Sequence, residues 1–180
     1  VVDKLVHRNT TVPCRATTRY TTYADNQTAV LLNISPDHLS RHGGMDGYVT
    51  AKRRIFRNQG PDDYAVIGVD DTRSGVMATQ LSCEGLRRVI PISAEYGLGR
   101  GVAVLEGKLQ DSVAGRAEHP VDITGAKALP GKHNHQNIAA AYAACRALGL
   151  EPGDILSAIE TFPGLPHRLE TIGTIDGVRF

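Results

Sequence analysis

The sequence predicts an α/β fold, with a mainly parallel sheet flanked by helices and a small antiparallel β portion. Two short, continuously apolar segments, residues 29–34 and 64–69, are typical of strands covered on both faces. A helical pattern over residues 45–58 separates them and ends before Gly60-Pro61, so the three segments form a βαβ unit. Residues 101–111 fit a hairpin, which supplies the antiparallel portion.

The remaining elements follow from the same kind of pattern. The hairpin of residues 101–111 is expected to turn at Glu106-Gly107, and an Ala-rich helix is expected to close at Gly149. Further elements are predicted as a strand over 87–93, the Ala-rich helix over 133–150, a helix over 151–161 and a terminal hairpin over 168–180 that turns at Asp176-Gly177.

Bulk composition bounds the function classes. The chain has 180 residues and a formal net charge of +1, so no global field recruits nucleic acid or an anionic membrane. No apolar run reaches the length of a membrane span, and the start of the chain lacks the apolar region of a signal peptide. Cys14, Cys83 and Cys145 are widely spaced and fit no metal-ligand pattern. These features favour a cytoplasmic protein with reduced thiols.

The first 28 residues differ in character from the rest. They are rich in Thr and Arg and show little apolar periodicity, whereas the α/β pattern begins abruptly at Ala29. Residues 1–28 are compatible with an irregular arm, a poorly ordered terminus or β structure. We therefore separate 1–28, an atypical N-terminal segment, from 29–180, a partial domain. Because the chain ends at Phe180 in mid-strand, we expect it to be a fragment.

The loop after the first predicted strand contains Asp37 and His38. In open α/β sheets, ligands bind at the carboxyl ends of the strands, and a carboxylate with an imidazole can hold a divalent cation there. An equally simple interpretation makes Asp37 a turn cap and His38 a solvated loop residue.

Lys52 lies inside the apolar stripe of the helix that follows this loop. At 100° per residue, it falls within an arc of about 120° that contains Met45, Tyr48, Val49 and Phe56. A lysine there either extends its amine to solvent or has a partner. If buried, its neutral amine could take up CO2, and the resulting carbamate could bind a metal beside His38.

Two further segments contain candidate binding residues. Asn134 and Asn137 are one turn apart at the start of the Ala-rich helix, where free N–H groups suit polar or anionic ligands. Simple capping of the helix by Asn134 is the alternative. Arg168 follows Pro166-His167 and could pair with phosphate, although a surface arginine is the default.

Three segments together resemble the Mur ligase family. They read LNISPDHLSRHGGMDGYVTAKRRIF, GKHNHQNIAAAYAACRALG and FPGLPHRLE, and they occur in the order found in that family. The likeness covers roughly residues 29–180. Within the family, the pattern favours the branch that adds D-glutamate.

The resemblance implies part of a central, ATPase-type domain from a cytoplasmic, monomeric ligase. It implies that His38 and a carbamylated Lys52 bind Mg2+ and serve catalysis, and that Asn134, Asn137 and Arg168 contact ATP. The implied reaction adds D-glutamate to UDP-N-acetylmuramoyl-L-alanine, with no nucleic-acid or membrane partner. Mg2+ would neutralise the transferring phosphoryl oxygens.

The departures from the family pattern predict that this chain alone is inactive. The upstream phosphate-binding loop and Glu-Ser-Ser segment and the downstream Asp-Ser-Lys segment are absent, and Ser40 stands where an aspartate is usual. Alternatives are another Mur-type or folate-polyglutamate ligase, a metal-dependent hydrolase using His38 and Lys52, and a non-catalytic nucleotide- or metal-binding remnant.

Overall fold

A computed structural model describes residues 27–36, 42–116, 118–165, 173–175 and 178–179. Within these ranges the chain forms a six-stranded sheet in the order β1-β2-β3-β4-β5-β6, and a separate two-stranded sheet, β7-β8. The strands of the main sheet are β1 (Thr28–Leu31), β2 (Tyr64–Gly68), β3 (Arg88–Ser93), β4 (Val102–Leu105), β5 (Lys108–Asp111) and β6 (Val121–Asp122). Strands β1 to β4 are parallel, and β5 and β6 continue the sheet antiparallel, which confirms the predicted fold class.

The predicted βαβ unit is present. Strand β1 pairs with β2 in parallel, with Thr28 opposite Tyr64 and Leu31 opposite Ile67. The first strand is shorter than the predicted 29–34 because the chain leaves the ladder after Leu31. The backbone N–H of Ile34 instead donates to the side chain of Asp71, at 3.0 Å.

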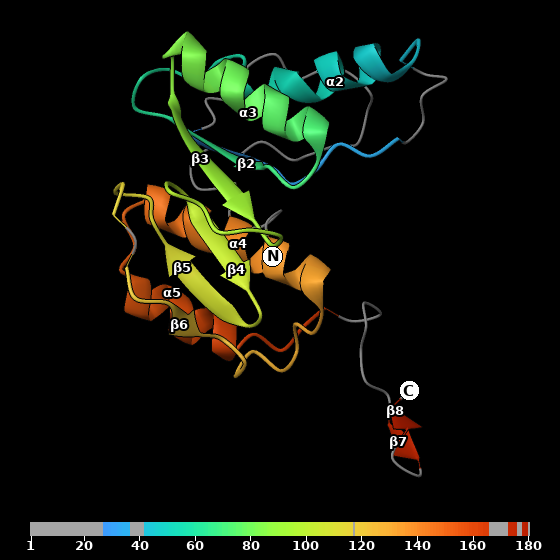
Figure 1. Ribbon diagram of the computed structural model, residues 1–180, viewed down its shortest axis with the longest axis vertical. Coiled ribbons are helices and arrows are strands. Elements are labelled where there is room, and N and C mark those ends of the chain that lie inside the picture. The colour runs from blue at the N-terminus through green and yellow to red at the C-terminus, as the bar shows by residue number, and fades with distance from the viewer. Residues whose placement is uncertain (1–26, 37–41, 117, 166–172, 176–177, 180) are drawn as a thin grey trace, which may run out of the picture.

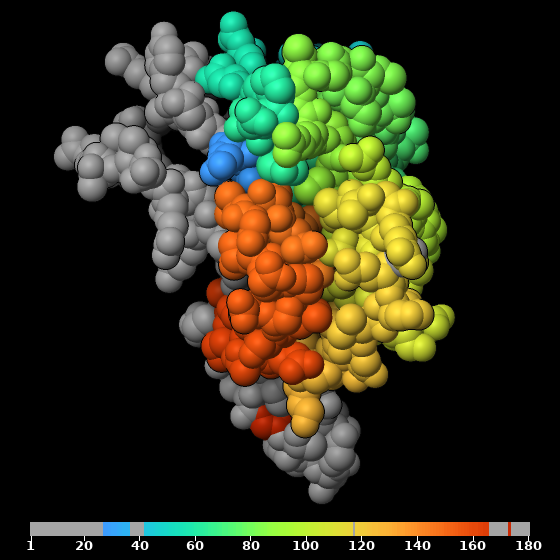
Figure 2. Space-filling view, turned by 90° about the vertical axis from the view of Figure 1, so that its left-hand side faces the viewer, coloured from blue at the N-terminus to red at the C-terminus, as the bar shows by residue number. Residues whose placement is uncertain are grey.

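Helices cover both faces of the sheet, as Figure 1 shows. On one face, α2 (Met45–Arg53) and α3 (Thr72–Glu84) enclose a core that includes Phe56, Ile67 and Leu81. On the other, α4 (Lys132–Ala147) packs against β2, β3 and β4, and α5 (Pro152–Glu160) packs against α4. Figure 2 shows α4 and α5, in orange, side by side as the outer layer of that face.

The helix predicted over 45–58 begins where expected but changes character before its end. Helix α2 stops at Arg53 and continues as a 3-10 turn, Arg54–Phe56. The tighter turn brings Phe56 to zero exposure, while Met45, Tyr48, Val49 and Ile55 pack against the same core. The predicted apolar stripe is therefore confirmed.

Helix α3 was not among the predicted elements. Its signals lie in the sequence, since Asp71 caps its N-terminus and Gly85, with φ of 65°, ends it. Its buried residues are Ser74, Met77, Ala78 and Leu81, and the serine interrupts the apolar pattern. The weak pattern explains why periodicity alone did not identify the helix.

The predicted hairpin of residues 101–111 is confirmed. Strands β4 and β5 pair antiparallel, with Leu105 opposite Lys108. The two turn residues, Glu106 and Gly107, have φ of 50° and 75°, as a two-residue turn matched to the twist of the strands requires.

The helices and hairpin of the C-terminal part also agree with the predictions. Helix α4 ends at Ala147, and Gly149 follows with φ of 82°, as a helix-terminating glycine should. Strands β7 (Thr174–Ile175) and β8 (Val178–Arg179) pair antiparallel, although the predicted turn residues lie outside the described ranges. Among the described helices, none combines the length and apolar character needed to cross a bilayer.

Candidate functional site

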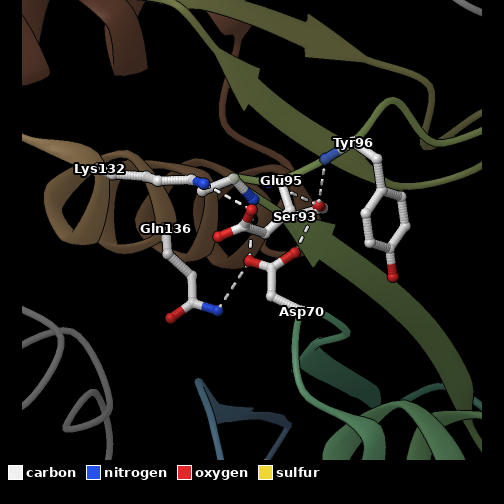
Figure 3. Close-up of polar contacts among 7 residues, drawn as sticks. Asp70, Ser93, Glu95, Tyr96, Lys132 and Gln136 are labelled. Atoms are coloured by element: carbon white, nitrogen blue, oxygen red, sulfur yellow. Dashed lines mark hydrogen bonds and ion pairs between the residues drawn. The ribbon is translucent and has the colours of Figure 1, made fainter.

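Polar side chains gather at the carboxyl ends of the parallel strands (Figure 3). Asn33 follows β1, Asp70 and Asp71 follow β2, and Ser93 is the last residue of β3. The first turns of α4 lie against the same edge. Parallel α/β sheets place ligands at this edge, so it is the candidate site.

Asp70 joins three of these elements. Its carboxylate accepts from the hydroxyl of Ser93 at 2.5 Å, the backbone N–H of Ala94 at 2.9 Å and the side-chain amide of Gln136 at 3.1 Å. The carbonyl oxygen of Gln136 accepts in turn from the amide of Asn33, at 3.4 Å. One network therefore connects the ends of β1, β2 and β3 to the first turns of α4.

The loop after β3 adds charge and an aromatic ring. Lys132 at the start of α4 forms an ion pair with Glu95, and both side chains are about half exposed. The hydroxyl of Tyr96 donates to the backbone carbonyl of Val69 at 2.7 Å. Partial burial and, secondly, the negative charge of Asp70 raise the pKa of Tyr96, which keeps this phenol protonated.

Asp71 ties the exit of β1 to the start of α3. Its carboxylate accepts from the backbone N–H groups of Ile34, Arg73 and Ser74 at 2.9–3.0 Å, and from the Ser74 hydroxyl at 2.5 Å. Burial acts to raise the pKa of Asp71, but the hydrogen bonds from Ser74, Ile34 and Arg73 together lower it. The carboxylate therefore stays ionised and fixes the chain just before the loop that contains His38.

An open hollow of about 430 Å³ lies between α3 and the loop after β3. Val76 and Tyr96 are half exposed in it. The hollow is lined by Val69, Asp70, Asp71, Thr72, Gly75, Val76, Thr79, Gln80 and Tyr96. None of the predicted site residues that the structure describes lines it.

Asn134 and Asn137 lie on one face of α4, as predicted. The side-chain amide of Asn137 donates to the side-chain oxygen of Asn134 at 3.2 Å, and the Asn134 amide donates to the carbonyl of Pro130 at 2.7 Å. The alternative in which Asn134 caps the helix is wrong. The cap residue is Gly131, which has no side chain to accept from the helix N–H groups. The Asn134 side chain bonds to Pro130 and Asn137 instead.

Lys52 is half-buried on α2. Its amine lies 5.4 Å from the centroid of the Tyr48 ring, which itself contacts the ring of His42. The lysine side chain therefore points back along its helix toward the N-terminal turn, the end that the preceding loop enters. This geometry is that of a cation–π contact.

Two of the predicted site residues, His38 and Arg168, lie outside the described residues, as does Asp37. Their approach to Lys52 and to Asn134 therefore stays a prediction. Among the described residues, no group of three or more His, Cys, Asp or Glu side chains could hold a metal ion.

Sequence reasoning did not single out Asp70, Ser93 or Gln136. For Asp70 and Ser93, the sequence offered one sign of a site role, because each ends or follows a buried strand at the edge where ligands bind. For Gln136 it offered none, since its partner is 66 residues away in sequence and only the packing of α4 brings the two together.

A sequence profile described as the Mur ligase middle domain matches residues 15–145. The chain belongs to the Mur ligase family. The match begins inside residues 1–28, the segment predicted to lie outside the domain, and the structure describes only the last two residues of that segment. The proposed boundary at residue 29 stays a prediction.

Two curated relatives of this Mur ligase domain illustrate the similarity. A UDP-N-acetylmuramoylalanine--D-glutamate ligase from Caulobacter vibrioides (strain NA1000 / CB15N) is 55% identical over 151 residues, covering 84% of this chain and 32% of that protein. The ligase of the same name from Rhodospirillum rubrum is 49% identical over 152 residues, with the same coverage. This chain spans about a third of the length of these relatives.

Solved structures agree on the fold. MurF from Acinetobacter baumannii matches with a TM-score of 0.60 and 26% identity, over 82% of this chain and 31% of that one. A UDP-N-acetylmuramoyl-L-alanyl-D-glutamate--2,6-diaminopimelate ligase matches with a TM-score of 0.62 and 23% identity, over 84% of this chain and 31% of that one. The second likeness shows the fold alone.

Proposed function

We propose that this chain is the middle domain of a ligase that uses ATP to join D-glutamate to UDP-N-acetylmuramoyl-L-alanine. The observation that carries the proposal is the 55% identity to the Caulobacter vibrioides D-glutamate ligase over 151 residues, against 26% to MurF. In the proposed reaction, the terminal phosphoryl group of ATP passes to the substrate carboxylate, and the amine of D-glutamate then displaces phosphate. The product is the new amide.

The nucleotide is proposed to bind at the first turn of α4. Asn134 and Asn137 present two amide side chains on one face there, and both are partly exposed. The N–H groups of Asn134 and His135 donate to the Gly131 carbonyl, but Gly131 has no side chain to accept from the N–H groups before them, which can therefore bond a polar or anionic ligand. Arg168 is proposed as a third contact to ATP.

Magnesium is proposed to bind beside the loop after β1, held by His38 and a carbamate on Lys52. Oxygen and imidazole donors suit a divalent cation, and when bound the ion would neutralise the transferring phosphoryl oxygens. With no modification, the Lys52 amine would remain the cation over Tyr48. Carbon-13 NMR in labelled bicarbonate tests the carbamate. We expect a signal that Lys52→Arg abolishes, and its absence at alkaline pH would contradict the modification.

A domain exchange tests the proposed reaction. The matching segment of the Caulobacter vibrioides ligase is replaced by residues 29–180 of this chain, and phosphate release is measured with UDP-N-acetylmuramoyl-L-alanine and D-glutamate. We expect the chimera to retain turnover with D-glutamate. The recipient supplies about two thirds of the chimera, so the readout is whether this segment completes a working ligase. ATP binding without turnover would support a non-catalytic remnant, and loss of both would support a different ligase.

A further inference from the structure

We propose that Asp70 is a positioning residue: through Gln136, its carboxylate fixes the first turns of α4 and thereby the direction in which Asn134 and Asn137 point. The proposal rests on the proposed function in one respect, because it takes the two asparagines to be nucleotide contacts. Neither asparagine bonds to Asp70. The direction of the two asparagines therefore depends on what holds α4 in place at this end.

Gln136 links α4 to the strand ends, and it is the more central of two polar ties there, because the Lys132–Glu95 ion pair lies between side chains that are about half exposed. The Gln136 amide donates to Asp70 at 3.1 Å, and its carbonyl oxygen accepts from Asn33 at 3.4 Å. Asp70 is in turn held by Ser93 at 2.5 Å and by the N–H of Ala94 at 2.9 Å. Figure 3 shows Gln136 reaching from α4 to the carboxylate. The partner that orients α4 is therefore itself fixed on two sides.

Gly68 provides an independent sign that this approach is close. A Cβ added at Gly68, two residues before Asp70, would lie 2.9 Å from the amide nitrogen of Gln136 and 1.8 Å from the carbonyl oxygen of Leu32. The end of β2 therefore has no room for a side chain between β1 and α4. The absence of a side chain at Gly68 lets β1 and the Gln136 amide approach the end of β2 this closely.

The position of Gln136 in the helix explains how one link sets two other side chains. Gln136 lies between Asn134 and Asn137 in sequence, within the same turn of a rigid helix. Successive residues are 100° apart around the helix axis, so holding Gln136 against the sheet fixes the rotation of that turn. Asn134 and Asn137, already bonded to each other, then point in one direction as a pair.

The test compares single and paired substitutions in this chain, with NMR of the Asn134 and Asn137 side-chain amides and a Mg-ATP titration. Asp70→Ala removes the acceptor and Gln136→Leu removes the donor, so each should break the link. In the double variant the link is already absent after the first change, so the second change should add little to it. Asp122→Ala is the matched control, because Asp122 also accepts from a neighbouring side chain but lies on β6.

We expect each single variant to shift the asparagine amide resonances and to weaken Mg-ATP binding about threefold to tenfold, the range of one lost hydrogen bond. The double variant should stay within about twofold of the weaker-binding single variant, because both changes remove the same link. Two unrelated losses of stability would instead add. Unchanged amide resonances in Asp70→Ala, or single effects that simply add in the double variant, would overturn the proposal.

The positioning role of Asp70 and the nucleotide role of α4 can be contradicted independently of each other. The ligand-free amide resonances decide the role of Asp70 whether or not nucleotide binds. If the parent shows no ATP-induced shift at about 10 mM, where a dissociation constant in the millimolar range is still visible, then the nucleotide role of α4 fails and the positioning result stands by itself.

Discussion

Asp71 accepts hydrogen bonds from two separate segments of the chain, the exit of β1 and the first turn of α3. A carboxylate that only capped α3 would accept only from the N–H groups of Arg73 and Ser74. The bond from Ile34 shortens β1 relative to the predicted strand, because the backbone turns to the carboxylate instead of continuing the ladder. One side chain therefore sets both the start of a helix and the start of the loop that contains His38.

Replacing Asp71 by Ala should destabilise the fold by about 1 kcal/mol at neutral pH, the usual cost of losing a helix cap. Because the pKa of Asp71 is lowered in the folded state, its stabilisation is present above the unfolded pKa, near 4, and is lost as pH falls through the folded pKa. Urea unfolding should therefore show a difference between parent and variant at pH 7 that shrinks below about pH 4.

Asp122→Ala on β6 is the matched control for that experiment. Asp122 is an exposed carboxylate bonded to the backbone and side chain of Thr124 within its own turn. Its loss should cost less, because no distant segment depends on it. A difference for Asp71→Ala that is equal at pH 3 and pH 7 would contradict the ionised-cap account.

At the residue scale, the sequence allowed some of the site to be predicted. Asn134 and Asn137 share a face because helical spacing requires it, and Lys52 lies in its apolar stripe for the same reason. Asp70 and Gln136 were missed because their contact depends on how α4 packs against β2, which no local pattern encodes.

Helix α4 is anchored at its other end by a buried polar cluster. The Tyr142 hydroxyl donates to the carboxylate of Asp111 at 3.0 Å, and Arg146 pairs with the same oxygen at 3.2 Å. Asp111 and Tyr142 are 5% and 1% exposed. Burial, with the nearby charge of Asp111 and its hydrogen bond, raises the pKa of Tyr142. The cluster ties the end of β5 to the second half of α4.

Tyr142→Phe should cost about 1–3 kcal/mol in the free energy of unfolding, because it leaves a buried carboxylate with one partner fewer. Since the pKa of Tyr142 is raised in the folded state, the hydroxyl stabilises the fold fully below the unfolded pKa of about 10 and progressively less above it. The difference between parent and variant should therefore narrow at strongly alkaline pH, as measured by chemical unfolding.

Tyr96→Phe is the control, since it also removes a bonded phenol but from a side chain that is about half exposed. It should cost distinctly less than Tyr142→Phe. Equal costs for the two variants would show that the buried cluster does not anchor α4.

At the element scale, strong local signals were sufficient for prediction. The strands β2 and β3, the hairpin β4–β5 and the helix α4 all follow from apolar runs, turn residues and an alanine-rich pattern. Helix α3 and strand β6 were missed for different reasons. The apolar face of α3 is interrupted by Ser74, and β6 has two exposed residues, so neither shows the expected period.

The whole molecule places two cores on opposite faces of one sheet. At the carboxyl ends of its strands, Asp70 bonds to Gln136 of α4, and Asp71 bonds to the exit of β1. This arrangement brings Asn33 and Gln136, which are 103 positions apart in sequence, into contact. It depends on the packing of both layers, and therefore on the fold as a unit.

Nucleotide binding by this chain alone should be weak. Asn134 and Asn137 are proposed to offer hydrogen bonds to ATP, but most phosphate affinity in ATP-binding domains comes from a glycine-rich loop and its lysine, a motif that this sequence does not contain. Calorimetry with Mg-ATP should therefore give millimolar affinity or no measurable heat. Micromolar affinity would mean that the phosphate site lies elsewhere in this chain.

The most direct test of the account is a crystal structure of this chain with magnesium and a non-hydrolysable ATP analogue at saturating concentration. The account predicts the nucleotide at the first turn of α4, with the amides of Asn134 and Asn137 within hydrogen-bond distance of it. A nucleotide bound in the hollow between α3 and Tyr96, with the two asparagines still bonded only to each other and to Pro130, would contradict it.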